Sequence, residues 1–280
     1  MGLFNPNYDK PGKGVRKDEP EKKGAALYWE LFSRKWRSYI TLNILYVLTC
    51  IPAFIYYFAI ASGLMPDWTP QESTAVASMI AVFMVIFFAG SPFKSGFTFV
   101  LRNFVRQQHA WTVSDFFGKT RENIWQSIVA FVIDIIVSTC FLFAVKFYFT
   151  ASQTSVWTSI LLGVVIFTMV MFAIMQSFTW CMMVTFKLKT AVIYKNAFLL
   201  SMATIPVNIL SLVIRVIATA AIFSSSMLAF LLIFSVFIAA SGLLEQMLAY
   251  PTVKKFLLSK VEEEKPSVAD EQSEMEGNNG

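Results

Sequence analysis

Six apolar segments, each long enough to cross the hydrocarbon core of a bilayer, constrain this chain more than any other feature. That core is about 30 Å thick and takes about 20 consecutive apolar residues as a helix. The predicted spans are about 39–62, 75–100, 125–149, 157–186, 204–223 and 226–249. Gly90-Ser91-Pro92 interrupts the second span, and only Ser224-Ser225-Ser226 separates the last two. We therefore predict an all-α fold, a polytopic membrane bundle of about six transmembrane helices.

Composition agrees with a membrane domain between polar tails. Apolar residues make up 56% of the chain and charged residues only 15%, whereas soluble domains carry about 25% charged residues. Residues 1–24 form a basic, polar stretch, and 259–280 form an acidic one without aromatic residues. Such segments bury too little apolar surface to fold. We predict that both are disordered tails of a transmembrane domain at 25–258.

The basic residues predict the orientation of the spans. All but Lys146 and Arg215 of the 23 lysines and arginines precede the first span, lie at or beyond the break after Pro92 in the second, or follow the fourth and sixth. Lys94 is among those at the break. Cytoplasmic loops carry the excess of Lys and Arg, so we expect both termini in the cytoplasm of a multi-pass protein of the bacterial cell membrane. The same bias explains the net charge of +5 without a nucleic-acid partner.

An amphipathic segment precedes the first span. Aromatic and basic residues are mixed between positions 25 and 37: Trp29, Arg34, Lys35, Trp36 and Arg37. Tryptophan favours the headgroup region, and cations favour anionic lipid. We predict an interfacial anchor helix, which either holds the bilayer surface generally or binds a specific phospholipid.

The predicted cytoplasmic loop at 101–124 is the richest in features. It mixes aromatic residues with both signs of charge: Arg102, Arg106, Trp111, Asp115, Phe116 and Phe117. Surfaces of this composition dock protein partners. The alternative is a second interfacial helix that stabilises the fold.

Charges inside the predicted spans are a second candidate site, because ionisable groups at bilayer depth are costly. Asp134 and Arg215 lie about nine and eleven residues from the cytoplasmic ends of their spans, which places them at similar depths. We predict an Asp134–Arg215 ion pair, either as part of a solute or proton path or as a structural staple. Glu245 lies near the cytoplasmic end of its span and is expected to reach the interface.

Signatures of catalysis are missing from the sequence. His109 is the single histidine, and Cys50, Cys140 and Cys181 lie inside apolar runs without metal-ligand spacing. No GxSxG, Walker A or GxGxxG motif occurs, so the sequence has none of the usual nucleophile or phosphate-binding signatures. We expect no enzyme activity, no cofactor and no metal.

Several motifs resemble those of the YesL family of bacterial membrane proteins, a family of unknown function found mainly in Gram-positive bacteria. The matching residues are 1–5, 8–11, Asn43, Pro52, 90–96, 99–106, 115–117, Asn123, Asn208 and 250–251. The resemblance covers the chain to about residue 258, and the block at 90–123 is its most specific part. The basic stretch at 12–23 and the acidic tail depart from the family pattern.

The resemblance implies a function in carbohydrate uptake, because genes of family members often lie beside those of sugar-binding proteins and ABC permeases. The first expectation is therefore a non-enzymatic accessory or regulator of ABC-type carbohydrate uptake, with permease subunits and the lipid bilayer as partners. The alternative is a small-solute transporter or channel that uses the Asp134–Arg215 region. A third is a membrane scaffold or stress protein.

Overall fold

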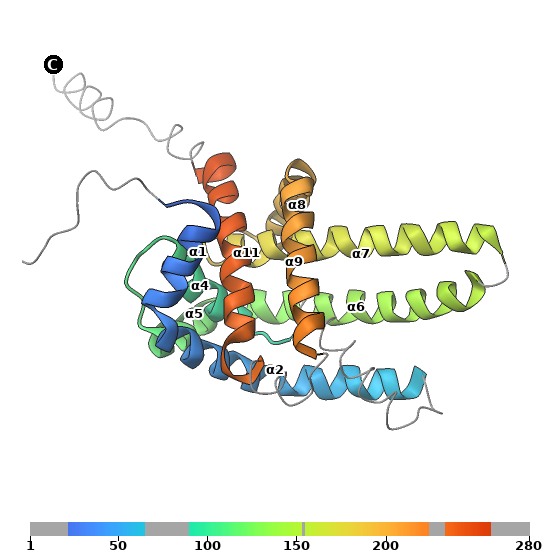
Figure 1. The fold of residues 1–280 in the computed structure, drawn as a ribbon, viewed down its shortest axis with the longest axis horizontal. Helices are drawn as coiled ribbons and strands as arrows, with labels where there is room; N and C mark the ends of the chain where they lie inside the picture. Colours follow the sequence, from blue (N-terminus) through green and yellow to red (C-terminus); the bar gives the residue numbers. More distant parts are fainter. Residues whose placement is uncertain (1–21, 65–89, 153–154, 224–232, 259–280) are drawn as a thin grey trace, which may run out of the picture.

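The computed structural model describes residues 22–64, 90–152, 155–223 and 233–258, and every regular element in these ranges is a helix (Figure 1). The α-helices are α1 (Gly24–Arg34), α2 (Trp36–Leu64), α4 (Lys94–Val105), α5 (Thr112–Glu122), α6 (Ile124–Ser152), α7 (Val156–Met183), α8 (Thr190–Ala203), α9 (Ile205–Phe223) and α11 (Ile238–Val253). Short π-helical segments, Ile233–Phe237 and Lys254–Leu258, flank α11. The acidic tail, nearly all of the basic tail and the serine turn at 224–226 lie outside the described residues.

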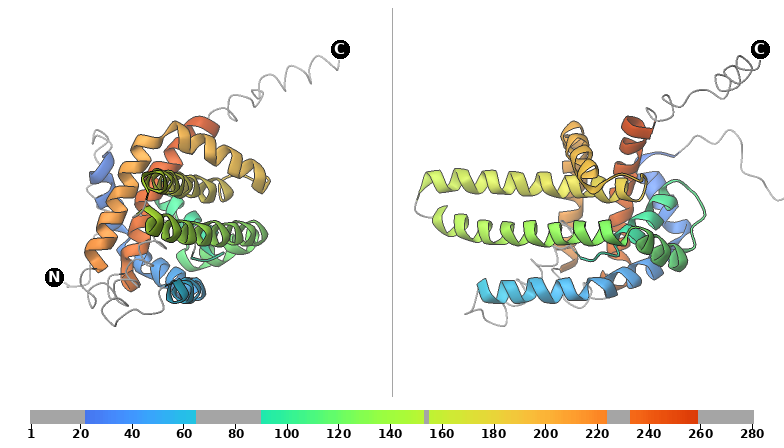
Figure 2. Two further views of the ribbon diagram at one scale, coloured as in Figure 1. Left: turned by 90° about the vertical axis from the view of Figure 1, so that its right-hand side faces the viewer. Right: turned by 180° about the vertical axis from the view of Figure 1, so that it is seen from behind.

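Three long apolar helices run in a common direction. α6 and α7 pack along each other as a hairpin, and α2 lies beside α6, where the Tyr57 hydroxyl is 2.6 Å from that of Ser138. Viewed along the hairpin, α2, α6 and α7 all appear end-on, whereas α9 and α11 run across them (Figure 2). The domain is therefore a parallel set of helices crossed by a second set.

Four described helices are long and apolar enough to cross a membrane: Trp36–Ile60, Ile124–Ser152, Val156–Met183 and Ser235–Leu257. The first three coincide with the first, third and fourth predicted spans, and the last overlaps the sixth but continues eight residues past its predicted end. The fifth predicted span is α9, but a bend of 92° at Thr204 joins it to α8, and the bent pair adds at most one further span. The protein is thus an all-helical, multi-pass membrane protein with four or five candidate spans in its described part.

The second predicted span, 75–100, needs a correction at its end. Residues 75–89 lie outside the described ranges. Residues 90–93 form a turn, and Lys94 begins a separate helix, α4, which continues to Val105. Pro92 lies in this turn and cannot donate a backbone hydrogen bond. Residues 94–100 are therefore not the last turns of a membrane span.

The end of the α6–α7 hairpin projects beyond the other helices in Figure 1. Large apolar side chains there are exposed, among them Phe147, Phe149 and Trp157. Exposed apolar area of this extent is rare on soluble monomers, and an α-helix leaves no backbone group unpaired in lipid. Lipid is therefore the environment that suits this end of the hairpin.

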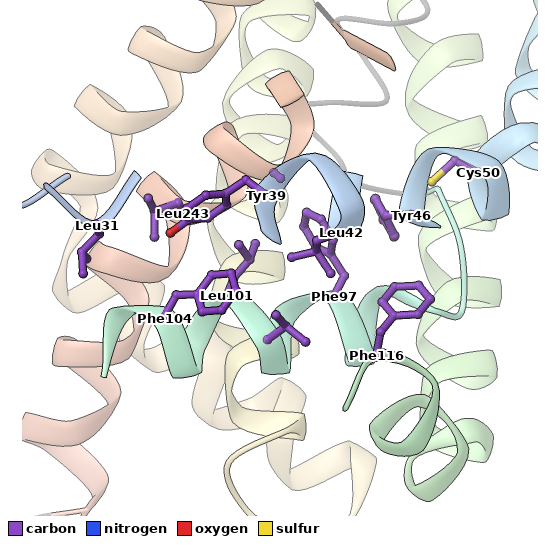
Figure 3. Close-up of a cluster of buried hydrophobic side chains, with 12 residues drawn as sticks. Leu31, Tyr39, Leu42, Tyr46, Cys50, Phe97, Leu101, Phe104, Phe116 and Leu243 are labelled. Atoms are coloured by element: carbon purple, nitrogen blue, oxygen red, sulfur yellow. The ribbon is translucent and has the colours of Figure 1, made fainter. Parts of the chain in front are cut away.

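At the end of the molecule opposite the projecting hairpin, α4 is the central helix. All of its residues except Phe99 and Val105 are buried. One side packs against α2 and α11, where Tyr46 stacks on Phe97 with ring centroids 4.3 Å apart (Figure 3). On another side Gly96 lets α5 approach so closely that a Cβ at this position would overlap the carbonyl oxygen of Phe116. These contacts hold the first residue of α4, Lys94, inside the molecule.

Candidate functional site

Lys94 is a buried cation at the start of α4. Its side chain is 1% exposed, and its Nζ lies 5.2 Å from the ring centroid of Trp180 on α7. A positive charge is unfavourable at a helix N-terminus, where the dipole is itself positive. The carboxylates of Glu245 and Asp134 act on this ammonium from α11 and α6. Lys94 therefore lies at the meeting point of three helices that are distant in sequence.

Asp134 lies on α6 and is 1% exposed. The side-chain amide of Gln176, on α7, donates a hydrogen bond to its Oδ1. Gln176 and Trp180 are four residues apart on α7 and so share a face of that helix. The face of α7 that meets Asp134 therefore also carries the indole beneath Lys94.

Arg215 forms a buried ion pair with Glu245. Its Nη1 lies 3.0 Å from Oε2 of Glu245, and both side chains are 4% exposed. The predicted Asp134–Arg215 pair was wrong: the acidic partner of Arg215 is on α11, not α6. The expectation that Glu245 reaches the interface was also wrong. Both errors have one cause. The depth of each charged residue in the bilayer follows from its position along the helix only if all spans are parallel, and α9 and α11 run across α6.

Lys94, Asp134, Arg215 and Glu245 together form what we call the four-charge cluster. Asp134, Arg215 and Glu245 all act electrostatically on Lys94, and the formal charges of the four residues cancel. Their helices, α4, α6, α9 and α11, meet around the inner half of α7 (Figure 1). The sequence did not indicate that Lys94 belongs to this site. The break at Pro92 suggested that the span ends there, so Lys94 was expected in a cytoplasmic loop.

Unpaired acceptors accompany these charges. In the described part of the chain, the buried carboxylate and amide oxygens without a hydrogen-bond donor are Asp134 Oδ2, Gln176 Oε1, Glu245 Oε1 and Gln246 Oε1. All four belong to α6, α7 or α11. A buried acceptor without a donor costs free energy, and a charged one costs most. The arrangement can therefore take up a proton or a ligand that brings donors.

The predicted docking residues divide into buried and exposed groups. Arg102 is buried and its Nη1 donates to the carbonyl of Val184 at 2.6 Å and to the hydroxyl of Thr185 at 2.9 Å, so it caps the C-terminal end of α7. Phe116 is buried in the core between α4 and α5. These two residues are structural, which corrects their assignment to a docking surface.

The exposed docking residues lie on and before α5. Trp111 is 72% exposed and Phe117 is 46% exposed, while Arg106 is exposed at the end of α4. Asp115 is half-buried, and its Oδ2 accepts the backbone N–H of Trp111 at 2.9 Å, which closes the first turn of α5. The surface available to a partner is therefore smaller and more aromatic than the sequence suggested.

The predicted anchor segment is helical, as expected. It forms α1 and the first turn of α2, and both Trp29 and Trp36 are exposed. Lys35, at the break between the helices, donates to the carbonyl of Gln108 at 3.1 Å and lies 4.5 Å above the Phe104 ring. Burial, and then the neighbouring charge of Arg34, lower the pKa of Lys35. Lys35 therefore fastens α1 to the α4–α5 connection instead of facing lipid.

Four exposed tryptophans gather at this end of the molecule. Trp29 and Trp36 are joined by Trp111 and by Trp125, at the start of α6, while Trp157 is exposed at the opposite end of the hairpin. Tryptophan marks both interfaces of a bilayer. Four exposed tryptophans at one end of the hairpin and Trp157 at the other match the tryptophan enrichment at the two interfaces of a spanning hairpin.

In the described ranges no group of three or more His, Cys, Asp and Glu residues could hold a metal ion. Comparisons with protein-family models, with curated proteins and with solved structures find no match to this chain. Functional assignment therefore rests on the four-charge cluster and on the exposed surfaces around it.

Proposed function

We propose that this protein is a non-enzymatic membrane transporter that moves a small polar solute across the bilayer, with the four-charge cluster as its binding site. The observation that supports the proposal is the burial of four ionisable side chains where candidate membrane helices meet. Ionisable residues at bilayer depth mark substrate and ion pathways in membrane proteins.

Stability alone gives a weak reason for such a cluster. Replacing a buried ion pair by apolar side chains of similar volume is often neutral or stabilising by about 1–4 kcal/mol. Arg215 and Glu245 are paired, but among the described residues Asp134 accepts a hydrogen bond within bonding distance only from the Gln176 amide, and its second oxygen is unpaired. An arrangement selected only to hold helices together would not retain an unpaired buried carboxylate oxygen.

The crossing helices support the same function. Transporters place their sites near the bilayer midplane, where helices are broken or change direction. Here α9 follows α8 through a bend of 92°, and α4 begins at the turn formed by residues 90–93. Arg215 and Lys94 are carried by these two helices, so movement of either helix would change the charge balance around Asp134 and Glu245.

Reconstitution of the full chain into liposomes tests the proposal. Jumps in the concentration of amino acids, monosaccharides and carboxylic acids are applied on a solid-supported membrane, and protein-free liposomes serve as the blank. We expect a solute-dependent current that Asp134→Asn and Glu245→Gln each reduce at least tenfold. Glu122→Gln is the matched control, because Glu122 lies on the surface of α5 and pairs only with Lys119. Unchanged currents in both cluster variants would contradict the proposal.

A second candidate is an accessory of ABC-type carbohydrate uptake, as the YesL resemblance implies, with both termini in the cytoplasm. The exposed Trp111, Phe117 and Arg106 favour it, since exposed aromatic and arginine side chains are typical binding hot spots. Mild-detergent purification from native membranes would then recover permease subunits, and Trp111→Ser with Phe117→Ser would release them. Recovery of the chain without permease subunits would count against this function.

A further inference from the structure

The two carboxylates of the four-charge cluster lie in different environments. Glu245 is held 3.0 Å from a guanidinium that is itself buried, so its negative charge has a direct counter-charge. Asp134 forms no ion pair with any described basic residue, and Gln176 supplies its hydrogen bond. Where two titratable groups differ in this way, their affinities for a proton separate. Asp134 is the carboxyl of the cluster without a direct counter-charge among the described residues.

The second oxygen of Asp134 strengthens this contrast. Among the described residues, buried Oδ2 has no hydrogen-bond donor within bonding distance, although the indole N–H of Trp180, itself unpaired, acts on the same carboxyl. In the charged state both carboxylate oxygens are acceptors only, whereas a protonated carboxyl carries its own O–H donor. A proton on Oδ2 would remove the negative charge from an oxygen that the protein does not otherwise satisfy. The amide oxygen of Gln176, the residue bonded to Oδ1, is also unpaired, and the Tyr194 hydroxyl, likewise unpaired, acts on this amide.

One cation and three tyrosine hydroxyls interact electrostatically with Asp134 from neighbouring helices. Lys94 approaches from α4, and the field of Asp134 extends to Tyr46 and Tyr57 on α2 and to Tyr194 on α8. The tyrosines are neutral hydroxyls and provide no counter-charge. Lys94 is the one described cation that acts on Asp134.

Lys94 is shared between the two carboxylates. Glu245 and Asp134 both act on Lys94 with the same sign, while Arg215 acts on it with the opposite sign. A change in the distance between Lys94 and Glu245 would therefore change how much positive charge remains for Asp134. Movement of α4 relative to α11 is thus linked to the affinity of Asp134 for a proton.

We propose that Asp134 is a proton-binding site that carries a proton on Oδ2 in the state described here, while Glu245 stays paired with Arg215. The proton comes from water on one side of the bilayer and returns to water on the other, so that charge and mass balance without a further reactant. Its use as a coupling ion rests on the proposed transport function, but its presence on Asp134 does not.

Infrared difference spectroscopy of the full chain in lipid nanodiscs tests this inference without any transport assay. Spectra recorded across a pH titration should contain the carbonyl stretch of a buried protonated carboxyl. Carbon-13 labelling of the aspartate side chains in the unmodified protein should shift that band, whereas labelling of glutamate should leave it in place. This comparison needs no substitution and so does not depend on the folding of a variant.

Two variants assign the band to a residue. Asp134→Asn, which keeps the size and the Oδ1 acceptor, should remove the band, and Glu245→Gln should retain it. A band that shifts with labelled glutamate, or its absence over the whole titration, would overturn the inference. A band on Asp134 in a protein without solute-dependent current would refute transport but not the proton site. Solute-dependent current in a protein that lacks the band would support transport and refute the proton site.

Discussion

Arg215 and Glu245 face each other across the contact between α9 and α11, with Nη1 and Oε2 3.0 Å apart and both side chains 4% exposed. The two helices lie next to each other and together cross α6 and α7 (Figure 1). The ion pair therefore joins the two helices whose direction departs from that of the long hairpin.

Removing one partner of this pair is expected to destabilise the protein strongly. Arg215→Met leaves the carboxylate of Glu245 buried without its counter-charge, and such losses cost about 3–5 kcal/mol. Arg215→Met combined with Glu245→Leu removes both charges and should recover most of that loss. Equal instability of the single and double variants would show that the pair is not the cause.

The stabilities of these variants can be compared by measuring cysteine thiol reactivity during heating. Cys50 and Cys181 are buried and become reactive only when the helices separate, whereas Cys140 is exposed and reacts in the folded state. The measurement therefore uses a Cys140→Ser background, and the Tm of each variant is read from the rise in labelling.

Gly96→Ala should separate α4 from α5. A Cβ at position 96 would overlap the carbonyl oxygen of Phe116 and the hydroxyl of Thr120, and a backbone carbonyl cannot move aside cheaply. Overpacking of this kind costs about 1–3 kcal/mol. Gly118→Ala on α5 is the matched control, because no atom lies within 4 Å of its added Cβ. It should leave the Tm unchanged or raise it slightly, since alanine favours helices over glycine by up to about 1 kcal/mol.

Arg102→Ala and Arg106→Ala should have different effects, although they are neighbours on the same predicted docking surface. Arg102 donates to two oxygens at the C-terminal end of α7, and loss of hydrogen bonds from a charged group costs about 1.5–3 kcal/mol. Arg106 is exposed, and its guanidinium lies 5.6 Å from the ring centroid of Tyr250, a contact worth about 0.5–1 kcal/mol. The same labelling assay should show a larger fall in Tm for Arg102→Ala. Equal falls would contradict the capping role of Arg102.

Single-tryptophan variants should report the position of the bilayer. Trp125 and Trp157 are exposed at opposite ends of the α6–α7 hairpin, and Trp180 is buried in the protein. Lipids brominated near the headgroup should quench Trp125 and Trp157 more than lipids brominated near the chain end, because both indoles belong at the interfaces. Trp180 should resist both lipids. Strong quenching of Trp157 by the deep bromines would mean that the hairpin ends inside the hydrocarbon.

Local sequence was sufficient for most of the helices. The hairpin predicted at 125–149 and 157–186 is present as α6 and α7, and the amphipathic segment at 25–37 is helical. Hydropathy predicts such elements because a membrane helix satisfies its backbone hydrogen bonds within itself. Its existence therefore depends on neighbouring residues and hardly on the rest of the fold.

The candidate site could be predicted only in part. Asp134 and Arg215 were found because a charge within an apolar run is visible in the sequence. Lys94 was not, because a lysine that follows Pro92 at the end of an apolar run looks the same whether the chain leaves the membrane or turns back into the protein. The structure shows that it turns into α4, whose first residue is buried.

The sequence by itself determined the class of the protein, the positions of its long apolar helices and two of its four buried charges, since these follow from the composition of short segments. Only the tertiary structure decided which charges meet. Pairing depends on the direction in which each helix crosses its neighbours, and that direction is set by contacts between residues far apart in the chain. Glu245 is next to Arg215, 30 positions away in the chain, because α11 lies across α6 and alongside α9.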